Sequence, residues 1–130
     1  IMVDMMEDFR ELTRVVDRVG KSGVIYIGGG VPKDFAQLVT VCRDLIHGGE
    51  VPYPHEYAIQ ITTDSPQWGG LSGCTLEEAI SWGKTSATGK NVTCYCDATI
   101  ALPLVAHALL ERVGKPRQGP DLSDICEREI

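Results

Sequence analysis

Three short apolar runs, each followed by a stretch with helical spacing, limit how this chain can fold more than any other feature. The runs at 23–28, 57–63 and 91–97 are rich in β-forming residues, so each predicts a buried strand. Apolar residues recur at helical spacing before the first run and after each of the three. Because alternating strands and helices form parallel sheets, the sequence predicts an α/β fold, a Rossmann-like parallel sheet with helices on both faces.

The expected helices have recognisable ends. A helix over residues 1–19 is followed by Gly20, and glycine commonly ends a helix. Pro32 suits the first turn of the second helix, and the string Thr75-Leu-Glu-Glu78 is a capping box that opens the third. The fourth helix is expected over 99–113.

The composition excludes several classes of protein. Of 130 residues, 43% are hydrophobic and 23% are charged, which fits one globular domain, with the polar residues 115–130 as a tail. A net charge of −6 argues against a nucleic-acid partner, and no apolar run reaches the ~18 residues of a membrane span. The five cysteines form no C-x-x-C pair and have no histidine at zinc spacing. We therefore expect a cytoplasmic protein with reduced thiols, no membrane contact and no metal site.

Glycine and polar residues gather where the expected strands end. The segments 28–30, 63–73 and 97–98 follow the three strands, and ligands of open parallel sheets bind beyond the carboxyl ends of the strands. The triple glycine would let a ligand approach the backbone closely, or it makes a tight turn only. Asp97 would bind a ribose hydroxyl or cap the next helix, and both roles can hold together. The sequence thus predicts a binding site at this edge.

Two further residues have alternative interpretations. Glu78 would bind an amine, but its place in the capping box favours a structural role. Lys84 follows Trp82-Gly83, and a lysine partly desolvated by an aromatic side chain can supply the free amine that imine chemistry needs. The residues alone favour an ordinary solvated lysine.

Three sequence motifs favour the functional interpretation of these residues over the structural one. Gly28-Gly-Gly-Val-Pro-Lys33, Glu78-Ala-Ile-Ser-Trp-Gly-Lys84 and Asp97-Ala98 resemble, in order and spacing, the C-terminal part of the deoxyhypusine synthase family, which includes homospermidine synthases and bacterial deoxyhypusine synthase-like proteins. The similarity covers about residues 1–113. It implies that residues 1–114 are the C-terminal part of a larger, doubly wound NAD-binding domain.

The resemblance also implies a reaction. Enzymes of this family use NAD to oxidise spermidine, and the aminobutyl group passes as an imine to a lysine, here Lys84. The acceptor amine is a lysine of a translation initiation factor in deoxyhypusine synthases and putrescine in homospermidine synthases. Family members are tetramers whose sites lie between paired subunits. By the same resemblance, the polyamine site would be lined by Gly29, Gly69, Gly70, Glu78 and Trp82, and NAD would contact Thr63, Asp64, Asp97 and Ala98.

The chain departs from the family pattern at three positions. Asp34 stands where the family usually has histidine, and Trp68 and Leu71 stand where the loop before the catalytic string usually carries aspartates. Asp34 would still hold a cationic amine and is included in the substrate site. The departures favour a bacterial-type member with another amine donor or acceptor, or a catalytically weak paralogue that serves as a partner subunit.

The resemblance bears on the length of the chain as well. Ile1 aligns within a helix inside the family's longer chain, so we expect a C-terminal fragment or one half of a split protein. Such a piece would expose a sheet edge and apolar surface that an N-terminal part or an oligomer covers.

Overall fold

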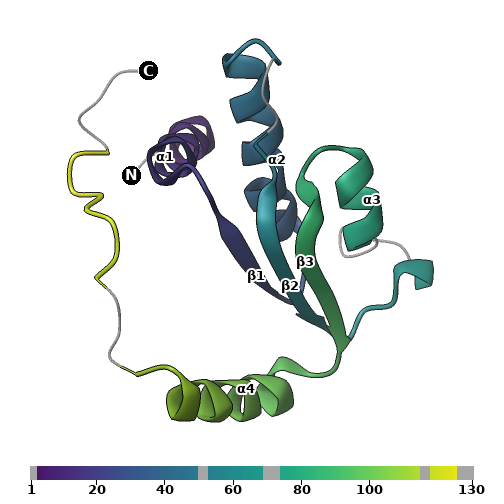
Figure 1. The fold of residues 1–130 in the computed structure, drawn as a ribbon. Coiled ribbons are helices and arrows are strands. Elements are labelled where there is room, and N and C mark those ends of the chain that lie inside the picture. Colours follow the sequence, from purple (N-terminus) through teal and green to yellow (C-terminus); the bar gives the residue numbers. More distant parts are fainter. Residues whose placement is uncertain (1–2, 50–52, 69–73, 115–117, 126–130) are drawn as a thin grey trace.

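The computed structural model describes residues 3–49, 53–68, 74–114 and 118–125. At its centre lies a three-stranded parallel sheet with the order β1 (Gly23–Ile27), β2 (His55–Thr62) and β3 (Thr85–Tyr95). Helices flank the sheet (Figure 1), so the predicted α/β class is confirmed. The helical elements are α1 (Met5–Val19), α2 (Val31–Ile46), the short 3₁₀ turn η1 (Pro66–Trp68), α3 (Leu76–Ser81) and α4 (Ala98–Arg112).

The helices begin and end where capping residues occur. Gly20 ends α1 with a φ of 71°, and its N–H donates to the carbonyl of Val16 at 3.1 Å. Pro32 lies in the first turn of α2. The Thr75 hydroxyl accepts a hydrogen bond from the N–H of Glu78 at 3.1 Å and caps α3. The predicted helix ends at these three places are confirmed.

The two faces of the sheet are covered unequally. On one face Tyr26 and Ala58 pack with Leu76 of α3 into a buried core. On the other face the register pairs Ile25 with Ile59, and these side chains are 63% and 36% exposed. The bare face also carries exposed Ile27, Tyr57 and Val92. Helix α4 lies across the carboxyl end of the sheet (Figure 1), away from most of this apolar surface.

Strand β3 begins earlier than the sequence predicts. Its first residue is Thr85 rather than residue 91, and a bulge lies where Thr85 pairs with His55 but Lys90 pairs with Tyr57. Gly89 makes this bulge possible, because a Cβ atom there would lie 2.2 Å from the carbonyl oxygen of Glu56. The residues of the bulge are small or polar, so no apolar alternation marks them as strand.

Residues 118–125, which follow α4 along the chain, lie on the α1 side of the molecule (Figure 1). Asp124 forms an ion pair with Arg18 of α1, and Ile125 is only 6% exposed. The expected polar tail therefore adds one apolar side chain to the buried residues. No helix in the described parts of the chain is long and apolar enough to cross a membrane.

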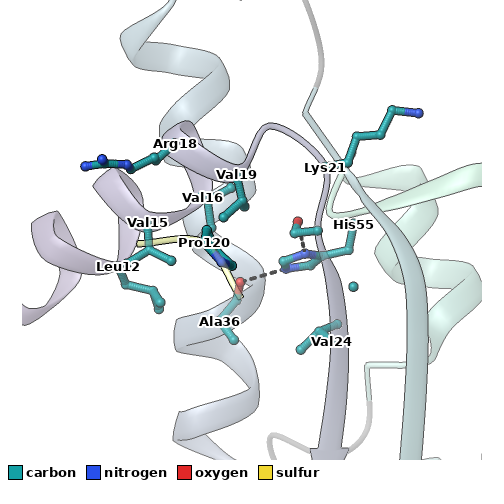
Figure 2. A pocket seen from close by; sticks show the side chains of 12 residues that line it. Leu12, Val15, Val16, Arg18, Val19, Lys21, Val24, Ala36, His55 and Pro120 are labelled. Atoms are coloured by element: carbon teal, nitrogen blue, oxygen red, sulfur yellow. Dashed lines mark hydrogen bonds between the residues drawn. The ribbon is translucent and has the colours of Figure 1, made fainter. Parts of the chain in front are cut away.

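A buried histidine closes the amino end of the sheet. His55 lies beside an apolar pocket of about 670 Å³ between α1, α2 and β1, and Figure 2 shows its imidazole pointing at Ala36. Its Nε2–H donates to the carbonyl of Ala36 at 3.1 Å, and its Nδ1 accepts from the Ser22 hydroxyl at 2.8 Å. Burial lowers the pKa of His55 below its ordinary value of 6.5, and the bond to Ala36 partly offsets this effect.

We expect stability to fall when the pH drops below the ordinary pKa of histidine. A group with a lowered folded pKa binds its proton on unfolding, so its contribution is complete above pH 6.5 and declines below it toward the folded pKa. Urea unfolding at about pH 7.5 and about pH 5.5 measures this loss for the native chain and for His55→Gln. The variant should lose less stability between the two pH values. An equal loss in both would contradict the assignment to His55.

Candidate functional site

A hollow lies at the carboxyl ends of all three strands. Its volume is about 270 Å³, and its wall includes every residue that the sequence assigns to the cofactor. It is lined by Ile27, Gly28, Ile61, Thr62, Thr63, Asp64, Cys96, Asp97 and Ala98. Gly28 has a φ of +84°, which residues with a side chain rarely adopt, and its N–H donates to the carbonyl of Ile61 at 2.7 Å.

Asp97 caps the helix that leaves this hollow. Its Oδ1 accepts hydrogen bonds from the hydroxyl of Thr99 at 2.7 Å and from the N–H of Thr99 at 2.8 Å. Both bonds lower the pKa of Asp97, and the bond from the hydroxyl has the larger effect. The capping role is therefore present, and the carboxylate remains exposed at the hollow. An exposed carboxylate, a threonine hydroxyl and a glycine backbone are groups that fit the ribose and phosphates of a dinucleotide.

Lys84 lies between α3 and β3. Its backbone N–H donates to the carbonyl of Ala79 at 2.9 Å, and its carbonyl accepts from the N–H of His55 at 3.1 Å. The side chain is half-buried, and its Nζ lies 5.6 Å from the ring centroid of Trp82. Both ends of this residue are thus fixed by the backbone, and its ammonium faces an aromatic ring.

A second lysine lies close to Lys84. Lys33, in the first turn of α2, is 1% exposed and donates from Nζ to Oε1 of Gln60 at 3.1 Å and to the carbonyl of Cys74. Burial is the main cause that lowers its pKa. The charge of Lys84 lowers this pKa further, whereas the nearby acids raise it.

The same groups act on Cys74. Burial is the main cause that raises the pKa of this thiol. The positive charges of Lys84 and Lys33 lower this pKa, whereas the negative charges of Glu78 and Asp34 raise it. We call these five residues the lysine cluster. It joins three residues that the sequence places in the site, namely Lys84, Glu78 and Asp34, although α2 and α3 are separate helices.

Other predicted residues lie around the cluster. Glu78 is exposed, and within the described residues its carboxylate makes no hydrogen bond. Gly29 lines a shallow pocket of about 190 Å³ together with Lys33. Trp68 is 82% exposed on η1. The predictions for Gly69, Gly70 and Leu71 fall outside the described residues.

Lys33, Gln60 and Cys74 have no role among the site residues that the sequence predicts. Lys33 belongs to the glycine string, but a lysine at a helix start is ordinarily solvated. Gln60 stands in an apolar strand and reaches both Lys33 and the carbonyl of Gly28, which accepts from its Nε2 at 3.0 Å. A glutamine inside a buried strand was the available signal, because buried amides need partners. Within the described residues, no group of three His, Cys, Asp or Glu side chains could hold a metal ion.

These features define the class as a parallel α/β protein with a polar hollow at its strand ends and a lysine cluster beside it. Residues 1–109 match the family model described as deoxyhypusine synthase, so the chain belongs to the deoxyhypusine synthase family. The predicted family membership is thereby confirmed.

The relatives differ in how similar they are. The chain is 53% identical over 122 residues to "Probable deoxyhypusine synthase 2" of Methanosarcina mazei, covering 93% of this chain and 35% of that protein. It is 56% identical over 110 residues to the Archaeoglobus fulgidus protein of the same name, covering 85% and 36%. A "Deoxyhypusine synthase-like protein" of Chlorobaculum parvum is 42% identical over 106 residues, covering 82% and 30%. The chain thus spans about a third of the length of these curated relatives. These two archaeal proteins are more similar to the chain than this bacterial one.

The cap at Asp97 can be separated from its charge. Asparagine also caps helices, so the denaturant midpoint of Asp97→Asn should stay close to that of the native chain. The midpoint of Asp97→Ala should be lower, because the N–H of Thr99 loses its acceptor. Chemical denaturation followed by circular dichroism measures both midpoints. If the two variants lost the same stability, the cap would not be the structural role of Asp97.

Proposed function

We propose that this chain carries part of the active site of an NAD-dependent transferase. The enzyme moves an aminobutyl group from spermidine, or a related polyamine, through an imine on Lys84 to an acceptor amine. The observation that carries the proposal is the lysine cluster, in which the charges of Lys84, Asp34 and Glu78 all act on the buried Lys33, and in which the Nζ of Lys84 faces the ring of Trp82. The chain's membership of the deoxyhypusine synthase family supports the same reaction.

The acids and the indole suit a polyamine. A carboxylate attracts the ammonium ends of such a substrate, and an indole covers a cation or its methylene chain. Glu78 and Trp82 are exposed, so both are accessible to a ligand. Asp34 is half-buried in the first turn of α2 and adds a second negative charge.

The hollow at the strand ends would hold NAD. Thr63, Asp64, Asp97 and Ala98 would contact it, and Gly28 allows close approach of the ligand to the backbone. When bound, NAD would accept a hydride from the carbon beside the secondary amine of spermidine, and the reduced cofactor would later return a hydride to the product. Gln60 links this hollow to the lysine cluster, because it bonds both Gly28 and Lys33.

Lys84 would act as the nucleophile in the first of two amine exchanges and as the leaving group in the second. Its Nζ forms a bond to the oxidised carbon of the donor, the bond from that carbon to the three-carbon diamine breaks, and a proton passes to the departing amine. The acceptor amine then forms its own bond to the carbon, and Lys84 leaves in the same way. Atoms balance in both exchanges, because each replaces one carbon–nitrogen bond by another.

The acceptor distinguishes the candidate reactions. The names of the archaeal relatives favour a lysine of a translation initiation factor. The changes at Asp34 and Trp68 favour a small amine such as putrescine, as in a homospermidine synthase-type enzyme, or a catalytically weak paralogue. A cytoplasmic location is also part of the proposal, and it agrees with the free thiols of Cys42, Cys74, Cys94 and Cys96.

Borohydride trapping tests the nucleophile. The protein as encoded by its gene is incubated with NAD and spermidine labelled in the aminobutyl group, and borohydride then reduces any imine. Label should join the native protein and the Lys90→Ala control, whose lysine is exposed on β3, and should be absent from Lys84→Ala. Label retained by Lys84→Ala, or absent from the native protein, would refute the proposal. Adding putrescine or the initiation factor then identifies the acceptor by where the label moves.

The bare face of the sheet indicates a protein partner. We propose that the remaining two thirds of the enzyme, or further subunits of a tetramer, cover the apolar side chains of Ile25, Ile27, Tyr57, Ile59 and Val92. This contact would exclude water from an apolar surface that β1, β2 and β3 share.

Sedimentation velocity tests this partner surface. The 130-residue chain alone should sediment as larger assemblies, because exposed apolar faces associate. Replacing Ile25 and Val92 together by lysine should reduce that association, since both side chains lie on the bare face. A well-folded native species of 14.1 kDa would contradict the proposed surface.

A further inference from the structure

We propose that Lys33 is a positioning residue that holds α3, and through it Glu78 and Lys84, in place for the reaction. Its Nζ joins three separate segments of the chain, namely the first turn of α2, strand β2 through Gln60, and the residue before the N-cap of α3 through the carbonyl of Cys74. This inference rests on the proposed function, because it assigns the step that Lys33 supports.

Stability alone does not explain this buried lysine. Lys33 is 1% exposed, and no carboxylate of the described residues forms an ion pair with it. Its acceptors are neutral, an amide oxygen and a backbone carbonyl. Burying a cation without such a pair is costly, and an apolar side chain of the same length would avoid that cost.

Helix α3 connects the hydrogen bond at Cys74 with Lys84. Thr75 follows Cys74 and caps α3 by accepting from the N–H of Glu78 at 3.1 Å. At the other end of the helix, the N–H of Lys84 donates to the carbonyl of Ala79 at 2.9 Å. Helix α3 has only six residues, and so short a helix is not stable without contacts from the rest of the protein. Lys33 supplies such a contact at the end where α3 begins.

Gln60 extends the same network to the hollow. Its Oε1 accepts from Lys33, and its Nε2 donates to the carbonyl of Gly28, which lines the hollow. The orientation of the Gln60 amide is set by these two bonds, since the oxygen can only accept and the nitrogen can only donate. One buried ammonium thereby fixes the glycine turn and α3 relative to each other.

The test compares Lys33→Met with the native protein as encoded by its gene. Methionine keeps an unbranched chain and removes the charge and both hydrogen bonds. We expect faster hydrogen exchange of the α3 amides, and imine trapping slowed about 10- to 100-fold at saturating NAD and spermidine, because a small displacement of reacting groups costs this much. Thr40→Val is the control, since Thr40 is buried in the same helix and its hydroxyl donates only to the carbonyl of Gln37.

The results of these measurements either support or contradict the positioning role of Lys33. Native exchange at α3, or native trapping rates, in Lys33→Met would overturn the inference, as would an equal slowing in Thr40→Val. If Lys33→Met does not fold, Gln60→Met replaces it, and normal trapping in that variant overturns the inference. If the native protein traps no label, the proposed function fails. The exchange measurement then still shows whether Lys33 holds α3.

Discussion

Parallel pairing of three strands is the constraint on which this structure depends. Because each strand must run in the same direction, the chain returns through α2 and then through α3 to the amino end of the sheet. The segments that follow the three strands therefore meet at one edge, where Gly28, Thr63 and Asp97 surround a hollow. The chemistry-bearing residues are far apart in the sequence, and the pairing alone brings them together.

The sequence predicts those parts of the fold that local signals determine. Strands β1 and β2 carry apolar β-branched residues, and Gly20, Pro32 and Thr75 mark helix ends that the structure confirms. The start of β3 could not be predicted, because its first residues pair with β2 through a bulge that only Gly89 allows. The burial of Lys33 could not be predicted from the sequence either, because it depends on Gln60 and Cys74, which lie 27 and 41 residues further along the chain. Local patterns carry no information on such distant partners.

The uneven cover of the sheet follows from the lengths and positions of its helices. Helices α2 and α3 both pack on the face that carries Tyr26 and Ala58, whereas α4 crosses the carboxyl end of the sheet. Ile25 and Val92 on the other face keep more than half of their surface exposed. A parallel sheet is ordinarily buried on both faces, so this face has the character of an interior surface without its partner.

The departure at Asp34 is best understood through its neighbour Lys33. Burial lowers the pKa of Lys33, and the negative charge of Asp34 acts in the opposite direction. A neutral histidine at this position would not offset the burial in this way, so the carboxylate helps the ammonium of Lys33 to persist in the interior. The same carboxylate adds negative charge to the side of the cluster where a cationic amine would bind.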